Sequence, residues 1–268
     1  MGISKSDLLS IKDFSNLTGI KQSTLRYYDD LGLFSPALRG DNGYRYYSPQ
    51  QIVTINSINL LNNLDMPIRQ ISEIQNNRTP EQMFKVFNEK EEALEIELLN
   101  LERSYNVVRT LKRMIQVGLT SDEAVVATRF MDALSIVIGP ENDFGDADHF
   151  YNSFLNFCME AKQYRIDLRL PVGGLFTDFG EFCRAPSKPA HFFSVDPKGL
   201  DKRSAGKYLS AFQRGYYGDT GDIVERMKKH LLEYELIPIG PVYNIFVFDE
   251  LSIDDPHNYL MHATVEVA

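Results

Sequence analysis

The sequence is poor in the residues that build disulfide frameworks, thiolate metal sites and membrane spans. It contains two cysteines, Cys158 and Cys183, which are too few for a disulfide framework or for a thiolate metal site within one chain. Its five histidines are scattered, with no two at positions i and i+4, so no metal and no cofactor is expected. No apolar stretch approaches the ~20 residues that span a bilayer, and we expect no membrane contact.

Residue combinations that carry out catalysis are also missing. No Ser/His/acid or Cys/His combination is evident, and only Glu181 with nearby tyrosines could act as an acid/base pair. Residues 1–14 lack the charged start, apolar middle and small-residue cleavage site of a secretory signal. We therefore expect a cytoplasmic protein that is not an enzyme.

Charge is distributed unevenly along the chain. With 268 residues the chain is long enough for two domains, each with its own core. The formal net charge is −9, but residues 1–75 and 76–117 each carry seven basic and seven acidic side chains. The whole acidic excess therefore lies in residues 118–268. Because an acidic domain repels phosphate, any contact with DNA is expected from the first part of the chain.

Two short helices are predicted near the N-terminus. Ser10 and Asp13 have the spacing of a capping box, and apolar residues then repeat at helical spacing until Gly19. The segment KQSTLRYYDDLGLF repeats its apolar residues in the same way and ends at Gly32. Two helices joined by a tight turn that contains glycine are typical of a helix-turn-helix.

A small hairpin, or wing, is predicted after the second helix. Residues 35–42 are rich in turn residues, and the aromatic run from Tyr44 to Tyr47 follows them. Ser48-Pro49 then begins another helix, and Pro67 begins one more.

A long helix with coiled-coil periodicity is predicted from Pro80 to Val117. Its apolar residues step by four, three, four and three, with one more a heptad later, and they are Leu94, Leu98, Leu101, Tyr105, Val108 and Ile115. Gly118 is expected to end this helix. The helix is long enough to form a dimer.

Beyond residue 123 the pattern mixes strands and helices. Strands are expected at residues 125–138, 168–170, 174–179, 191–195, 207–213, 242–248 and 259–267, and helices at residues 146–164 and 222–235. Because the order of strands and helix recurs, we predict a duplicated α+β unit with helices on one face of an antiparallel sheet.

Three parts of the sequence resemble a known family. The strings TLRYYDDLGLF and GYRYYS, followed by LDMP at residues 64–67, closely resemble the DNA-binding head of the MerR family over residues 10–75. The long helix resembles the antiparallel dimerisation helix of that family. The segments IGPVYNIFVFDE and NYLMHATVEV resemble the GyrI-like effector domain of its multidrug-responsive branch.

This resemblance implies an architecture and a mechanism. The implied fold is α+β, with a winged helix-turn-helix domain at residues 1–77, an antiparallel coiled-coil dimerisation helix at 78–118 and a GyrI-like effector-binding domain at 119–268. The implied regulator is a homodimer that binds double-stranded promoter DNA and lets RNA polymerase dock. It activates transcription by distorting an overlong spacer when a small aromatic, drug-like effector binds.

The predicted DNA contacts lie on the second helix and on the wing. Tyr27 is expected to reach DNA while Tyr28 packs with Leu25, because neighbouring residues of a helix point about a quarter-turn apart. Side chains at the start of a recognition helix read base edges, whereas Arg and Tyr further along bind phosphate. The predicted set is Lys21, Gln22, Thr24, Arg26, Tyr27, Arg45, Tyr46 and Tyr47. Taken alone, Lys21 and Gln22 could be solvated surface, and the aromatic run could be strand core.

The effector residues follow from the family motif. The matching positions are Tyr151, Tyr208, Asn244, Phe246 and Tyr259. Relatives that bind lipophilic cations have a buried glutamate where this chain has Asn244, and an amide cannot offset the cost of desolvating a cation. The ligand is therefore neutral or weakly charged, or another carboxylate takes over, with Glu181, Glu250 and Glu266 as candidates. Each ring could instead belong to the core of the sheet domain.

A DNA-binding architectural protein without a ligand stays open as one alternative, and it requires a C-terminal domain that lacks a cavity. A thiolate metal or redox sensor is disfavoured because residues 1–157 contain no cysteine. The chief alternative for the whole chain is a GyrI-like protein that sequesters or hydrolyses a small molecule.

Overall fold

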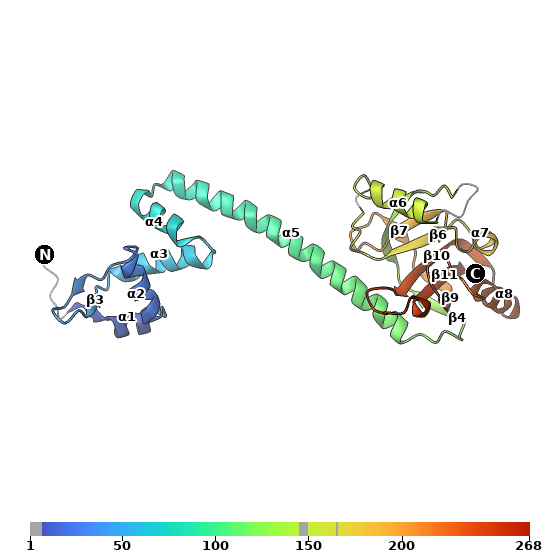
Figure 1. Cartoon of the computed structure of the whole chain (residues 1–268), viewed down its shortest axis with the longest axis horizontal. Helices are drawn as coiled ribbons and strands as arrows, with labels where there is room; N and C mark the ends of the chain where they lie inside the picture. Colours follow the sequence, from blue (N-terminus) through green and yellow to red (C-terminus); the bar gives the residue numbers. More distant parts are fainter. Residues whose placement is uncertain (1–6, 145–149, 165) are drawn as a thin grey trace. The chain divides into compact units, whose positions relative to one another are not determined.

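A computed structural model describes residues 7–144, 150–164 and 166–268. The chain divides into two compact units, residues 1–95 and 96–268 (Figure 1). Helix α5 (Pro80–Leu119) begins in the first unit and ends in the second. Among the described residues, none of the helices combines the length and the apolar character needed to cross a membrane.

The first unit contains the two predicted short helices, α1 (Ile11–Thr18) and α2 (Gln22–Asp30). The Ser10 side chain accepts a hydrogen bond from the Asp13 amide and caps α1, as the capping box predicts. Gly19 and Gly32 follow the two helices with left-handed backbone angles, φ 72° and 68°. These conformations favour glycine, and they end both helices at the predicted places.

A three-stranded sheet and two more helices complete the first unit. The strands β1 (Leu9–Ser10), β2 (Leu38–Arg39) and β3 (Arg45–Tyr47) pair in the order β1-β3-β2, so the predicted wing is confirmed and gains a strand from the N-terminal segment. Helices α3 (Gln51–Asn63) and α4 (Ile68–Asn77) follow. Their buried side chains include Ile55, Ile58, Leu61 and Ile71, which share one core with α1 and α2.

The second unit is built on one eight-stranded sheet in which neighbouring strands are antiparallel. The strands are β4 (Ala127–Met131), β5 (Leu134–Glu141), β6 (Val172–Phe176), β7 (His191–Ser194), β8 (Asp201–Arg203), β9 (Gly206–Arg214), β10 (Pro238–Phe248) and β11 (Leu260–Val267). The helices are α6 (Phe150–Glu160), α7 (Phe179–Arg184) and α8 (Ile223–Glu233), with a short 3-10 turn η2 (Pro256–Asn258).

The strand order confirms the predicted duplication. One half runs β5, α6, β6, β7 and the other runs β9, α8, β10, β11. In the sheet the second half lies in the order β9-β11-β10 and the first half in the order β6-β7-β5, and the two halves meet where β10 pairs with β6. Counted outward from this pairing, each half shows its second, third and first strand. The fold class is therefore α+β, as predicted.

The two faces of this sheet have different neighbours. Helices α7 and α8 cover one face, which we call the helix face, where Met227 of α8 packs with side chains such as Ala263 of β11. Residues 114–117 of α5 pack against the opposite face, beside Phe212 and Val247.

Several predicted boundaries are wrong. Residues 125–138 form two strands, β4 and β5, rather than one, and residues 168–170 form no strand. Strand β8 and helix α7 were not predicted, and α7 begins at Phe179, inside a predicted strand. The predicted helix at 146–164 is seen as α6, although its first part lies outside the described residues.

Gly118 does not end the long helix. Helix α5 continues to Leu119, and Gly118 is buried within it. A Cβ atom at this position would lie 2.6 Å from Cε1 of Phe248, closer than packed atoms allow. The glycine therefore serves the close approach of α5 to the sheet rather than the end of the helix.

Candidate functional site

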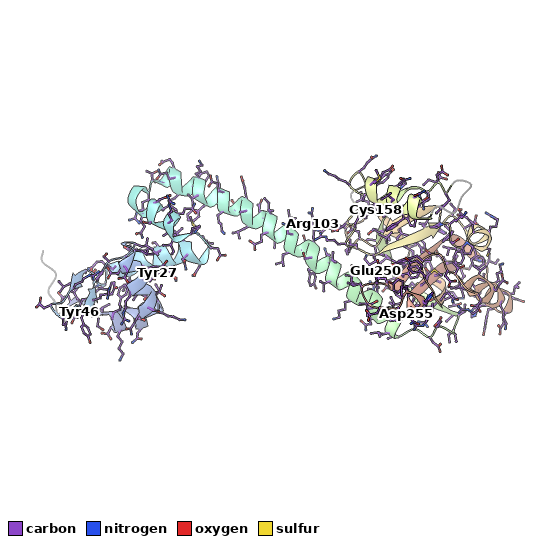
Figure 2. All side chains as sticks on the ribbon, in the orientation of Figure 1. Tyr27, Tyr46, Arg103, Cys158, Glu250 and Asp255 are labelled. Atoms are coloured by element: carbon purple, nitrogen blue, oxygen red, sulfur yellow. The ribbon has the colours of Figure 1, made fainter. Side chains whose placement is uncertain are left out.

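The exposed side of α2 carries most of the predicted DNA contacts. Tyr27 is 52% exposed whereas Tyr28 is 3% exposed, so the predicted division between the two tyrosines is confirmed. Arg26 is exposed beside Tyr27, and Lys21 is exposed at the N-cap of α2. Gln22 and Thr24 are half-buried. Figure 2 shows Tyr27 on α2 and Tyr46 on β3, both in the N-terminal unit.

A buried carboxylate of α2 holds the wing. The Asp29 side chain is fully buried, and its Oδ2 accepts hydrogen bonds from Nη2 of Arg39 at 2.7 Å and from Nε of Arg45 at 2.6 Å. Arg45 also reaches Oδ1 of Asp30 at 3.2 Å. Burial acts to raise the pKa of Asp29, but the hydrogen bonds from Arg45 and Arg39 outweigh it, and the pKa lies below its ordinary value. The carboxylate therefore stays ionised and fixes both arginines against α2.

The aromatic run of the wing divides between surface and core. Tyr47 is fully buried, and its ring stacks with Phe14 at 4.6 Å and with Phe34 at 5.6 Å between centroids. A phosphate cannot reach this ring, so the expectation that Tyr47 contacts DNA is wrong. Tyr47 is instead a core residue of its strand. Tyr46 is half-buried, and the Arg45 side chain is 20% exposed because Asp29 and Asp30 hold it.

Four aromatic rings gather in the second unit. Tyr217 lies at the centre, with ring centroids 4.7 Å from Phe246, 5.6 Å from Tyr259 and 5.2 Å from Tyr216. We call Tyr216, Tyr217, Phe246 and Tyr259 the aromatic cluster. It joins the end of β10 and the start of β11 to the loop that follows β9.

Two carboxylates lie at the aromatic cluster. The Tyr217 hydroxyl donates a hydrogen bond to Oε2 of Glu250, which follows β10. Burial, and then this hydrogen bond to Glu250, raise the pKa of Tyr217 above its ordinary value. Burial also raises the pKa of the neighbouring Asp249. Rings beside a carboxylate can enclose an aromatic or cationic group.

Comparison with known proteins bears on both units. A family model described as MerR HTH family regulatory protein matches residues 9–78. These residues therefore form a MerR-type helix-turn-helix domain. The chain is 24% identical over 252 residues to the multidrug-efflux transporter 2 regulator of Bacillus subtilis, which covers 92% of this chain and 91% of that protein.

Two further relatives match at different lengths. The chain is 28% identical over 284 residues to the multidrug-efflux transporter 1 regulator of Bacillus subtilis, covering 98% of this chain and 99% of that one. It is 44% identical over 68 residues to the transcriptional regulator BrlR of Pseudomonas aeruginosa, covering 25% of each chain. These curated relatives are transcription regulators rather than enzymes.

The structure brings together only part of the predicted effector set. Phe246 and Tyr259 meet in the aromatic cluster. Asn244 lies on the helix face, where its Oδ1 accepts a hydrogen bond from the Gly174 amide at 2.9 Å. That bond links the side chain to β6. The side chain of Tyr151 lies outside the described residues.

Tyr208 does not join the aromatic cluster. It alternates along β9 with Leu209 and so points away from the helix face. Its hydroxyl donates to the Ser204 carbonyl at 3.0 Å, and the Arg203 guanidinium lies 4.9 Å from the centroid of its ring. These contacts link the Tyr208 side chain to the end of β8 and the residue that follows it.

Of the three candidate carboxylates, Glu250 is the one at the aromatic cluster. Oε2 of Glu181 accepts hydrogen bonds from the amide and hydroxyl of Thr177, at 2.6 and 2.7 Å. Glu266 lies on β11, opposite Tyr208 of β9. Sequence reasoning missed Tyr216 and Tyr217 as a pair, although a Tyr-Tyr step between Gly215 and Gly218 is a signal of an aromatic loop.

No group of three His, Cys, Asp or Glu side chains is placed to hold a metal ion within the part of the chain that the structure describes. The thiols of Cys158 and Cys183 are half-buried and free, and burial raises the pKa of each. A higher pKa leaves less of the thiolate that binds metals.

Proposed function

We propose that this chain is a MerR-family regulator that binds promoter DNA as a homodimer and activates transcription when a small aromatic ligand, preferably a cation, occupies the aromatic cluster. The observation that carries the proposal is the hydrogen bond between Tyr217 and Glu250 within a group of four rings. The two full-length relatives, whose names describe them as regulators of multidrug-efflux transporters, support the choice of ligand class.

DNA binding is assigned to the exposed side of α2. Lys21 and Gln22, at the start of this helix, are proposed to read base edges in a major groove, because recognition helices insert their N-terminal residues there. Thr24, Arg26 and Tyr27 then bind the phosphate backbone. On the wing, Tyr46 and Arg45 add flanking phosphate contacts, with Arg45 positioned by Asp29.

The dimer is assigned to α5. Five of the six residues of the predicted stripe are exposed: Leu94 43%, Leu98 67%, Leu101 66%, Tyr105 62% and Val108 64%. The sixth, Ile115, instead packs against the sheet of its own chain. A soluble protein rarely leaves such a stripe in water, and its alternating steps of four and three match the seam of a coiled coil. A second copy in antiparallel orientation would cover it.

The charge of the ligand follows from Glu250. In the relatives that bind lipophilic cations a glutamate stands at the position of Asn244, and this chain has a carboxylate at the aromatic cluster instead. Glu250 supplies negative charge next to the rings, and both the charge and the rings attract an aromatic cation.

Activation is proposed to work through the shape of the promoter. The ligand shifts the dimer toward a form that bends and untwists an overlong spacer, so that RNA polymerase engages both promoter elements. Ligand binding then changes transcription while DNA affinity stays nearly constant.

Run-off transcription with purified polymerase tests the proposal. The ligands are tetraphenylphosphonium, an aromatic cation, and triphenylphosphine oxide, a neutral relative of similar shape. Transcript that rises with the cation, at unchanged promoter occupancy in a mobility-shift assay, is the expected result. A protein that binds the cation but no promoter DNA would instead be a sequestering protein.

A further inference from the structure

A pocket of about 1150 Å³ lies in the C-terminal unit, between α5, α6, the segments at residues 162–164 and 166–170, and the segment from 196 to the start of β8. Pockets that hold drug-sized molecules have volumes of about 300–1,000 Å³, so this one is large enough. It shares no lining residue with the aromatic cluster. Figure 2 labels Arg103 on α5 and Cys158 on α6, which line it from two sides.

Apolar side chains form much of the lining. They come from β5, from the segment that follows α6 and from the residue before β8, and they are Val137, Ile138, Ala161, Ile166, Leu168, Leu170 and Leu200. Ala161 and Ile166 also belong to the core that packs α6 on the sheet. An apolar body of a ligand can therefore lie on a surface that the core holds in place.

The three acidic residues of the lining are already engaged. Arg169 donates two hydrogen bonds to Asp167, from Nε to Oδ1 at 2.9 Å and from Nη2 to Oδ2 at 2.6 Å. The hydrogen bond from Arg169 is the main reason why the pKa of Asp167 is lowered. Asp196 accepts from the Lys198 amide at 2.8 Å, and Asp201 accepts from the Ile138 amide at 3.1 Å.

Two of the four basic residues of the lining are not engaged in this way. Arg169 is bound to Asp167, and the Lys198 ammonium lies 2.8 Å from Oε2 of Glu102. For Arg103 and Lys162, no ion pair or hydrogen bond is found among the described residues. Arg103 is near enough to Asp167 for its charge to help lower the pKa of that carboxyl, but neither Arg103 nor Lys162 is held in an ion pair within the described part of the chain. Both side chains can therefore turn toward a bound anion.

We propose that this pocket binds an amphipathic organic anion, with its carboxylate or sulfonate paired to Arg103 and Lys162 and its apolar body against the lining of β5 and α6. The lining holds four basic and three acidic side chains. This small basic excess is local, since residues 118–268 as a whole carry all of the chain's net negative charge. A charged acceptor is the group that a guanidinium and an ammonium outside ion pairs recognise best. The site is separate from the proposed cation site and does not depend on it.

A ligand in this pocket would also contact α5. Arg103 and Asn106 belong to that helix, and the rest of the lining belongs to the sheet domain. Binding therefore adds contacts between the helix and the domain, in a place where Lys198 and Glu102 already form an ion pair between them.

Calorimetric titration of the full-length protein with 2-naphthoate and its neutral amide, 2-naphthamide, tests the proposal. We expect the anion to bind more tightly than the amide. In the double variant Arg103→Gln/Lys162→Gln, naphthoate affinity should fall about tenfold or more, with little change for the amide, because hydrogen bonds to a charged group are lost. Arg109→Gln removes one positive charge from an exposed position of α5 outside the pocket, and this variant should change neither affinity.

Two further measurements exclude other binding sites. Asn106→Trp places a large side chain at the pocket wall and should abolish naphthoate binding while the circular dichroism spectrum is retained. Saturation with tetraphenylphosphonium should leave naphthoate affinity unchanged. Equal affinity for naphthoate and the amide, an unchanged double variant or competition by the phosphonium cation would each overturn the proposal.

Discussion

Tyr217 donates a hydrogen bond to Glu250 from the middle of a group of four aromatic rings. The bond joins the loop after β9 to the residue pair that follows β10. The bond holds a carboxylate, Glu250, beside the rings, whereas the family motif indicates a carboxylate at position 244, which is Asn in this chain.

The first prediction concerns that charge. Glu250→Gln should lower the affinity for tetraphenylphosphonium about tenfold, because a carboxylate next to the rings stabilises a desolvated cation. Affinity for triphenylphosphine oxide should change little. Fluorescence or calorimetric titration measures both.

Glu233→Gln provides the matched control, since Glu233 is exposed near the end of α8 and away from the aromatic cluster. Equal losses for the cation and the oxide in Glu250→Gln would mean that Glu250 shapes the site without supplying its charge.

A second prediction concerns the residues of α2. Arg26→Ala should weaken binding to all DNA sequences and reduce the slope of log affinity against log salt by about one, as expected for one lost phosphate contact. Lys21→Ala should instead relax sequence preference. Mobility-shift titrations at several salt concentrations, with cognate and scrambled DNA, separate these effects.

Lys12→Ala, on the exposed side of α1, controls for charge alone. If Lys12→Ala and Arg26→Ala reduce the salt slope equally, α2 has no special role in phosphate binding.

Burial of Asp29 leads to a third prediction. Asp29→Asn should destabilise α2 and the wing by about 2 kcal/mol, because Arg45 and Arg39 lose a buried charged partner. Hydrogen exchange of peptides from α2 and β3, followed by mass spectrometry, measures the loss. Asp30→Asn is the control, because the Asp30 side chain is 68% exposed and its pair with Arg45 contributes less than about 1 kcal/mol.

The same carboxylate gives stability a dependence on pH. The pKa of Asp29 is lower in the folded protein, so its contribution is present above the unfolded pKa of about 3.9 and is lost as the pH falls through the folded pKa. The difference in melting temperature between the wild type and Asp29→Asn should therefore be largest near neutral pH and shrink below about pH 4. A difference that grows on acidification would contradict the lowered pKa.

A fourth prediction concerns the stripe of α5. Leu98→Asp should convert the dimer to a monomer, because it places a charge on the seam that a second copy is proposed to cover. Light scattering coupled to size-exclusion chromatography measures the mass. Asn100→Asp adds the same charge away from the seam, and this variant should remain dimeric. A monomeric wild type would refute the assignment of the stripe as the dimer seam.

The sequence predicted the parts of the fold that local rules determine. Ser10, Gly19 and Gly32 mark helix ends through a side-chain cap and left-handed backbone angles, and the structure confirms all three. The break between β4 and β5 at Asp132-Ala133 contains neither glycine nor proline, so no local signal separated the two strands.

Positions that depend on pairing could not be predicted in the same way. In a strand of three residues the sequence does not say which side chains face the core, and Tyr47 proved to be buried while Tyr46 is half-exposed. Tyr208 and Phe246 both lie on strands, but only the register of β9, β11 and β10 shows that they occupy opposite faces. The pairing of Tyr217 with Glu250 likewise joins residues 33 positions apart.

Fluorescence of 2-aminopurine placed at the centre of the promoter spacer tests the central claim most directly. The account predicts that tetraphenylphosphonium added to the saturated protein–DNA complex raises this fluorescence, because the spacer is distorted and unstacked. Anisotropy of the same complex should remain unchanged, since the protein stays bound. Constant fluorescence at full ligand occupancy, or release of the DNA by the ligand, would contradict the account.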